Sequence, residues 1–162
     1  MDATERAALI EQYRAGPVEL RAALAEVGEA NLDHRPADGG WTPREVVHHT
    51  ADSEMTSAIR LRRLVAEDDP AIVGYDGDEF ARRLRYNDRP IAPALEAIAG
   101  ARSTTIQILE RLTHAEWQRT GTHSEMGAYG VERWLGIYAA HCHEHADQIR
   151  RAVEVARPLA RG

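Results

Sequence analysis

The chain has 162 residues, a length typical of one domain that buries about two thirds of the surface of its unfolded chain. Hydrophobic residues make up 43% of the sequence and charged residues 28%, as in ordinary globular proteins. The net charge of −6 argues against nonspecific nucleic-acid binding, which depends on surplus lysine and arginine. We therefore expect a single domain over residues 1–162 with no nucleic-acid partner.

The single cysteine, Cys142, rules out a disulfide within the chain and fits a reducing compartment. The first residues, Met1–Arg6, are charged, and no apolar run approaches the roughly 18 residues that a spanning helix needs. These features predict a cytoplasmic protein with no membrane partner. The neighbours of Cys142 offer no activating base, so a small buried side chain is favoured over a ligand or nucleophile.

Long helical patterns account for most of the sequence. The first recurs at spacings of three and four over residues 10–27, and Gly16-Pro17 should kink this helix without ending it. The second begins at Thr42, which forms a capping box with Glu45 and is followed by a proline at the first helical position. It continues to about Glu67.

Two further helical patterns follow. The third begins near Pro93 and keeps its apolar spacing to Leu112, and the fourth extends from about Val131 to Ala156, ahead of Pro158. The chain shows neither the alternation typical of strands nor an internal repeat. We therefore predict an all-α fold, an antiparallel four-helix bundle.

Two connections are too long to be simple turns. Residues 68–92 hold a short helical piece at Asp78–Leu84, and residues 113–130 start with a second capping box, Thr113 to Glu116, before a glycine-bearing loop. Long loops in compact domains are often functional, so both connections are candidates for functional segments.

The fourth helical pattern carries His141, His143 and His145. Residues four apart share a helical face, about 6 Å apart along the axis, so His141 and His145 can converge on one metal ion. His143 lies about 200° round the helix from His141 and should point elsewhere. Both His141 and His145 fall within the apolar stripe, where an unpaired imidazole costs roughly 1 to 3 kcal/mol. A shared ion would satisfy both; alternatively, one bonds a buried hydroxyl and the other reaches solvent.

A third ligand has to come from another element, and the adjacent His48 and His49 of the second helix are the best candidates. The apolar residues of that helix centre more than about 90° away from His49, which places it on a polar face. This face is compatible with ligation if it lines an open cleft, as a catalytic metal with a vacant position requires.

Residues 39–54, the short pieces Asp69-Pro-Ala-Ile and Tyr75-Asp, and residues 135–145 together resemble the DinB/YfiT-like family of metalloenzymes. The resemblance implies that His49, His141 and His145 bind the metal. It also implies an up-down-down-up bundle and a homodimer.

The same resemblance implies either metal-dependent hydrolysis or the transfer of a low-molecular-weight thiol, such as bacillithiol or mycothiol, to electrophilic toxins. Three neutral imidazoles leave a divalent ion with its full charge and an open position, which suits both reactions. We favour the thiol transferase and keep the hydrolase as the alternative. Zinc is the first choice, and nickel, iron or manganese also suit nitrogen ligands.

Arg60 shares the helical face of His49, and Arg63 follows it, so we predict that this basic rim binds the carboxylate of a charged thiol. The alternative is a solvated face that pairs with the acidic residues 67–69. No catalytic residue is assigned. His123 lies in a loop that resembles the family's segment before its last helix, which places it beside the cleft without making it a ligand.

Two other interpretations stay open. The ion could merely staple the bundle, in which case a fourth protein ligand is expected, whereas water completing the shell favours catalysis. A metal-free helical module is the third interpretation, and it leaves the placement of His141 and His145 unexplained.

Overall fold

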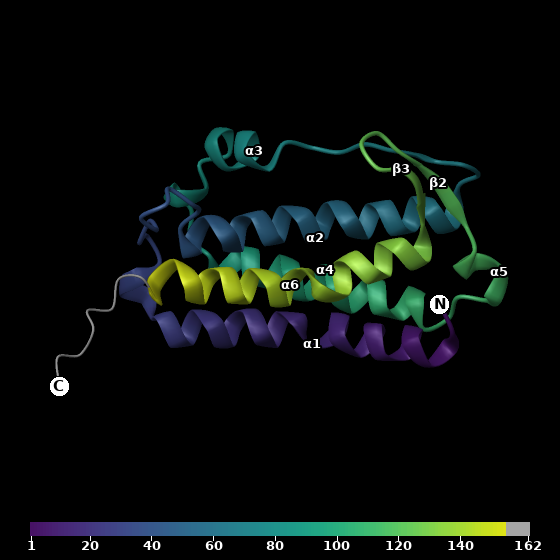
Figure 1. The fold of residues 1–162 in the computed structure, drawn as a ribbon, viewed down its shortest axis with the longest axis horizontal. Helices are drawn as coiled ribbons and strands as arrows, with labels where there is room; N and C mark the ends of the chain where they lie inside the picture. The colour runs from purple at the N-terminus through teal and green to yellow at the C-terminus, as the bar shows by residue number, and fades with distance from the viewer. Residues whose placement is uncertain (155–162) are drawn as a thin grey trace.

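Four long helices lie side by side along the molecule in the computed structural model, which describes residues 1–154 (Figure 1). They are the four predicted from sequence, with these bounds: α1 (Ala3–Val27), α2 (Pro43–Ala66), α4 (Ala92–Leu109) and α6 (Val131–Glu154). The prediction that the last helix reaches Ala156 falls outside the described residues. None of the described helices is long and apolar enough to cross a membrane.

The start of α2 follows from its sequence. The Thr42 hydroxyl accepts the backbone N–H of Glu45 at 3.1 Å, and the Glu45 carboxylate accepts the backbone N–H of Thr42 at 2.9 Å. This reciprocal capping satisfies two amide groups that have no partner inside the helix. The second predicted capping box, at Thr113, likewise begins a short helix, α5 (His114–Trp117).

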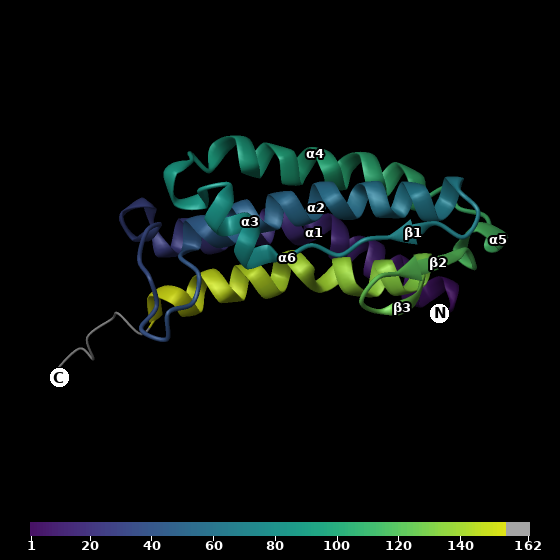
Figure 2. The ribbon, with the colours of Figure 1, turned by 90° about the horizontal axis from the view of Figure 1, so that it is seen from above.

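The helices α1 and α6 run in one direction and α2 and α4 in the other, so the bundle has the up-down-down-up topology implied by the family resemblance (Figures 1 and 2). Because α2 and α4 are parallel, the chain must return along the bundle between them. That return path holds β1 (Ala71–Ile72), the predicted short helix α3 (Gly77–Arg83) and a 3-10 turn (Tyr86–Asp88).

A small sheet corrects the expectation that the chain has no strands. β1 pairs in parallel with β2 (Thr120–His123), and β2 pairs antiparallel with β3 (Gly127–Gly130). These strands are two to four residues long, and β2 and β3 contain glycine, so they carry no readable alternation. They form because two long connections meet beside the bundle. A Cβ on Gly121 would overlap the carbonyl oxygen of Pro70, so this meeting requires glycine.

A polar layer divides the interior of the bundle into two apolar clusters. One cluster surrounds Trp134 and Tyr13, and the other surrounds Leu20 and Ile149. Between them lie buried polar residues of α2 and α4, which are Ser53, Glu54, Ser57, Arg102 and Thr105, together with His141 of α6 at the edge of the layer. His141 is therefore held beside a polar layer that lies between the two apolar clusters.

The helix α1 passes through Pro17 without ending, as predicted. Proline has no backbone N–H, so the carbonyl of Tyr13 loses its usual donor four residues later. Nη1 of Arg102 donates to that carbonyl instead. Gly16 makes room for this contact, because a Cβ there would overlap Nη1 of Arg102 and lie 2.8 Å from Cβ of Cys142.

We predict that Gly16→Ala lowers the free energy of unfolding by about 1–3 kcal/mol, because the added methyl group overpacks the polar layer. Urea denaturation of both proteins measures the difference. Gly100→Ala is the matched control: a Cβ there meets nothing within 4 Å, so this variant should be unchanged or about 0.5–1 kcal/mol more stable. Equal stability of wild type and Gly16→Ala would contradict the close packing of α1 against Arg102.

Candidate metal centre

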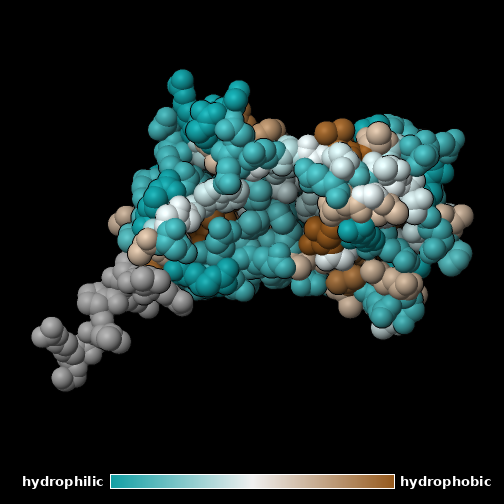
Figure 3. Space-filling model, turned by 45° about the horizontal axis from the view of Figure 1, so that its top comes forward, coloured by the Kyte–Doolittle hydropathy of each residue, from teal (hydrophilic) through white to brown (hydrophobic). Residues whose placement is uncertain are grey.

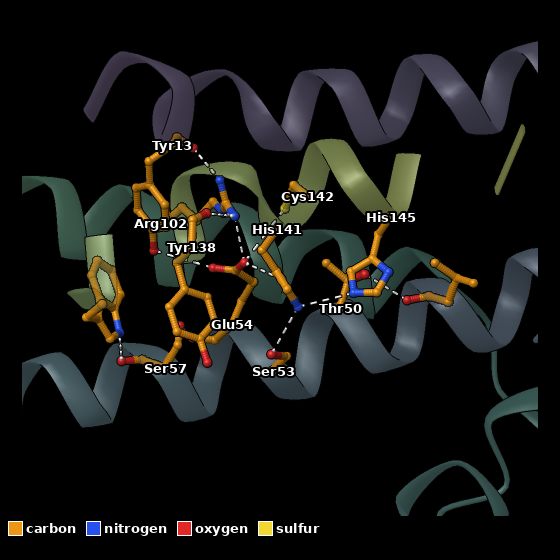
Figure 4. Close-up of polar contacts among 12 residues, drawn as sticks. Tyr13, Thr50, Ser53, Glu54, Ser57, Arg102, Tyr138, His141, Cys142 and His145 are labelled. Atoms are coloured by element: carbon orange, nitrogen blue, oxygen red, sulfur yellow. Dashed lines mark hydrogen bonds and ion pairs between the residues drawn. The ribbon is translucent and has the colours of Figure 1, made fainter. Parts of the chain in front are cut away.

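The three histidines predicted to bind a metal come together in the structure. His49 of α2 and His141 and His145 of α6 each present one ring nitrogen, and these nitrogens lie within 4.8 Å of one another. His141 and His145 extend from successive turns of α6 toward α2 (Figure 4). Within residues 1–154 no fourth histidine, cysteine or carboxylate joins this group.

A buried carboxylate orients His141. Its Nδ1 lies 3.1 Å from Oε1 of Glu54, whose side chain is fully buried, and Nη2 of Arg102 donates to the same oxygen at 2.7 Å (Figure 4). Burial alone would raise the pKa of Glu54, but the hydrogen bond from His141 and the charge of Arg102 lower it below its usual value. The ionised carboxylate therefore accepts the Nδ1 proton of His141, which leaves Nε2 as a free lone pair.

His145 is oriented in the same way by a neighbour on its own helix. Its Nδ1 lies 2.8 Å from the side-chain oxygen of Gln148, so that its Nε2 also carries a lone pair. The two Nε2 atoms of His141 and His145 are 3.1 Å apart. A divalent ion between these two nitrogens would satisfy both, and nitrogens about 2.0–2.1 Å from a tetrahedral ion lie a little over 3 Å apart. The donor set thus fits a divalent metal ion.

The charge state of the site agrees with this fit. Burial, followed by the neighbouring imidazoles, lowers the pKa of His49 to about 3, and burial followed by His141 lowers the pKa of His145 to about 4. Both rings are therefore neutral at pH 7, as metal ligation requires. Among residues 1–154, Nδ1 of His49 has no hydrogen-bond partner although it is buried. The ring centres of Trp41 and His49 are 4.5 Å apart.

The polar face of α2 lines an open cleft. Such a cleft is what the sequence pattern requires if His49, which lies on that face, is to bind a metal. The cleft has a volume of about 270 Å³ and lies between α2, α6 and the two long connections. In the space-filling view the surface is hollowed between the part that carries α3 and the part that carries β2 and β3 (Figure 3). The lining residues are His49, Ser53, Arg60, Gly74, Tyr75, Gly77, His123, Glu125, Met126, Ile137, Tyr138 and His141.

The two arginines of the predicted basic rim separate in the structure. Arg60 lines the cleft and is 8% exposed. Arg63 does not line it; its guanidinium pairs with the carboxylate of Glu67 at 2.9 Å and donates to the carbonyl of Ala71 at 2.7 Å. Arg63 therefore pairs with a nearby acidic residue, which is the alternative that the sequence analysis gave for both arginines.

Other histidines and the cysteine lie away from the three nitrogens. Nε2 of His143 is 2.9 Å from the carbonyl of Gln12, and Nε2 of His48 is 3.1 Å from the carbonyl of Arg89. Burial raises the pKa of the Cys142 thiol well above its ordinary value, which makes it unreactive at neutral pH. His123, in contrast, borders the cleft.

Sequence reasoning missed the residues that support His141. Glu54 is the last residue of the segment that carries the resemblance, and Arg102 lies on the third predicted helix, four residues after the buried Ile98 and four before the buried Ile106. The signal that could have revealed Arg102 is a charged residue at the apolar spacing of a helix, because such a charge needs a buried partner.

A model of the DinB superfamily matches residues 12–149. The chain belongs to this family. A protein of Oceanobacillus iheyensis, named "Putative metal-dependent hydrolase", is 35% identical over 130 residues, which cover 80% of this chain and 75% of that protein. A Geobacillus thermodenitrificans protein of the same name is 34% identical over 137 residues, with coverages of 82% and 75%.

A solved structure is similar over nearly the whole chain. YfiT from Bacillus subtilis, described as "a probable metal-dependent hydrolase with an unusual four-helix bundle topology", has 27% sequence identity and a TM-score of 0.89. The match covers 96% of this chain and 90% of YfiT. The family, the fold and its topology predicted from the sequence are thereby confirmed.

We predict that His141→Ala/His145→Ala loses most of the bound divalent metal while remaining helical, because one ligand cannot hold the ion. Metal content after dialysis against zinc, with far-ultraviolet circular dichroism as the folding check, measures this. His143→Ala is the matched control and should keep the ion, since its ring faces Gln12. Stoichiometric metal in the double variant would remove the assignment.

We also predict that the metal-free protein loses stability as the pH falls from about 6.5 to about 4. The folded-state pKa values of about 3 for His49 and about 4 for His145 lie below the unfolded value of about 6.5, so only the unfolded chain takes up protons in this range. Their contribution is present above pH 6.5 and is lost on acidification. Urea denaturation with a chelator at several pH values measures it, and His49→Gln/His145→Gln should show a shallower dependence than wild type.

Proposed function

We propose that this DinB superfamily member is a metal-dependent enzyme that transfers a low-molecular-weight thiol to electrophilic compounds. The observation that carries the proposal is the set of three converging imidazoles beside an open cleft that contains a buried arginine. His49, His141 and His145 would hold the ion. When bound, such an ion supplies Lewis-acid chemistry and lowers the pKa of a thiol or water that coordinates to it.

The side chains of the cleft would bind and orient the substrates. Arg60 would bind the carboxylate of the thiol through charge-assisted hydrogen bonds. Glu54 and Gln148 fix the ring orientations of His141 and His145 and keep their Nε2 atoms free. The hydroxyl of Ser53 lies 3.3 Å from Nε2 of His141, where it can donate a hydrogen bond to a group bound at this end of the cleft.

The scarcity of free carboxylates in the cleft supports transfer. Among its lining residues Glu125 is the one carboxylate, and it is exposed at the rim, whereas Glu54 is occupied by Arg102 and His141. Addition of a thiol to an electrophile needs a deprotonated sulfur. Hydrolysis of an ester or amide needs, in addition, a group that protonates the leaving group, and no unpaired carboxylate of residues 1–154 inside the cleft can fill that role.

Metal-dependent hydrolysis is the second candidate, and the names of the relatives favour it. The Oceanobacillus and Geobacillus proteins and YfiT are all described as metal-dependent hydrolases. A purely structural ion is the third candidate. The absence of a fourth protein ligand among residues 1–154 supports an open, catalytic coordination position over a closed structural one.

Zinc is the metal that we propose, since it takes three histidines and leaves a position open, and nickel, iron or manganese would use the same nitrogens. The homodimer implied by the family resemblance stays a prediction.

We predict that Arg60→Ala raises the Michaelis constant for an anionic thiol at least tenfold more than for an uncharged thiol, because one charge-assisted contact is lost. Zinc-loaded protein would be assayed with 3-mercaptopropionate and 2-mercaptoethanol against monochlorobimane. Arg62→Ala, on the same helix but outside the cleft, is the control and should leave the ratio unchanged.

Two outcomes would count against the transferase. Equal effects of Arg60→Ala on both thiols would remove Arg60 from the thiol-binding site. Consumption of an ester or amide by zinc-loaded protein, without consumption of any thiol, would establish the hydrolase instead.

A further inference from the structure

The end of the cleft away from the histidine cluster contains a buried cation without a counter-ion. Within the described residues Arg60 makes no ion pair, although it is 8% exposed. Its Nη2 donates to the carbonyl of Val73 at 2.6 Å and its Nη1 to the hydroxyl of Tyr138 at 3.3 Å. Nε has no partner. A buried charge held only by neutral groups favours an anion close to it.

His123 adds a hydrogen-bond donor of fixed direction. It is 2% exposed and lines the same cleft. The backbone N–H of Glu125 donates to its Nδ1 at 3.1 Å, so the neutral ring must carry its proton on Nε2. Burial, followed by the charge of Arg60, lowers the pKa of His123, which keeps the ring neutral. Nε2 has no acceptor among residues 1–154.

Tyr129 supplies a third unpartnered group. Its ring centre is 5.2 Å from that of His123, it is 1% exposed, and its hydroxyl makes no hydrogen bond. Burial raises the pKa of this hydroxyl, so it stays protonated and can donate. Native proteins leave few buried polar groups unsatisfied, because each one costs free energy. Arg60 and His123 line the cleft, and Tyr129, which does not line it, packs against His123. Three such groups together indicate that a ligand supplies the missing acceptor.

The small sheet brings His123 and Tyr129 together. His123 is the last residue of β2 and Tyr129 lies on β3, and the antiparallel pairing brings the two strands together beside Arg60 of α2. The strands that the sequence did not predict therefore carry two of the three unpartnered donors.

We propose that Arg60, His123 and Tyr129 form a carboxylate-binding subsite for the substrate, separate from the three histidines. One cation and two neutral donors match a monoanion with two acceptor oxygens. The positions of His49 and Arg60 are about 16 Å apart along α2 at about 1.5 Å per residue, so a ligand that reaches both ends of the cleft is elongated. The subsite deepens the proposed function, because it uses the same cleft, but it does not require turnover.

The test is calorimetric titration of the zinc-loaded full chain with pentanoate, and with pentanamide as the uncharged probe. His123→Leu and Tyr129→Phe should each weaken pentanoate binding at least tenfold and leave pentanamide unaffected. The melting temperature of Tyr129→Phe should equal or exceed that of wild type, since this change removes only an unsatisfied buried hydroxyl, whereas His123→Leu also loses the hydrogen bond from the backbone N–H of Glu125. Tyr86→Phe is the matched control, because the buried Tyr86 donates to Asp52 outside the cleft.

Pentanoate binding should persist in His141→Ala/His145→Ala, which separates this subsite from the metal centre. Loss of binding in that variant, together with unchanged binding in His123→Leu and Tyr129→Phe, would place the carboxylate on the metal and overturn the proposal. Failure of wild type to bind pentanoate at millimolar concentration would also overturn it. Neither result depends on whether thiol transfer occurs.

Competition identifies the source of the carboxylate. Displacement of pentanoate by 3-mercaptopropionate in preference to fumarate would assign the subsite to the thiol. The reverse order would assign it to a carboxylate-bearing electrophile, and both results support the subsite. Displacement by neither compound would overturn it.

Discussion

The ion pair between Glu54 and Arg102 is the interaction on which the site and the bundle both depend. Its two residues are 48 positions apart in the chain, and both side chains are almost fully buried. Arg102 also donates to the carbonyls of Tyr13 in α1 and Tyr138 in α6, so one guanidinium connects all four long helices (Figure 4). Breaking such a pair leaves an uncompensated buried charge, which typically costs about 3–5 kcal/mol.

The same ion pair links the packing of the four helices to the orientation of His141 in the cleft. Glu54 stays ionised because Arg102 and His141 bind it, and it therefore holds the Nδ1 proton of His141 and directs Nε2 toward His145. Gly16 and Pro17 in α1 serve this arrangement from a distance, by making space and by freeing a carbonyl for Arg102. Features of α1 that look like helix defects thus help to position a metal ligand on α6.

The cleft combines a site that fits a cation with a region that lacks an anion. Three imidazoles converge at one end, and unpartnered donors gather around Arg60 at the other. Both ends retain polar groups that the protein alone leaves unsatisfied, which costs stability in the absence of ligands. This arrangement is typical of a site organised for what it binds.

The sequence by itself determined the four long helices, the start of α2 at Thr42, the family of the chain and the pair His141 and His145. These features depend on local spacing, short motifs and short-range capping. The family resemblance added His49 to that pair. Only the tertiary structure decided that the polar face of His49 lines a cleft, that Arg60 enters this cleft while Arg63 pairs with Glu67, and that Glu54 and Arg102 support His141. The sheet could not be predicted either, since its strands are short and β1 pairs with β2 across about 50 residues of chain. Contacts between residues so far apart follow from how the helices pack, and helical periodicity carries no information about that packing.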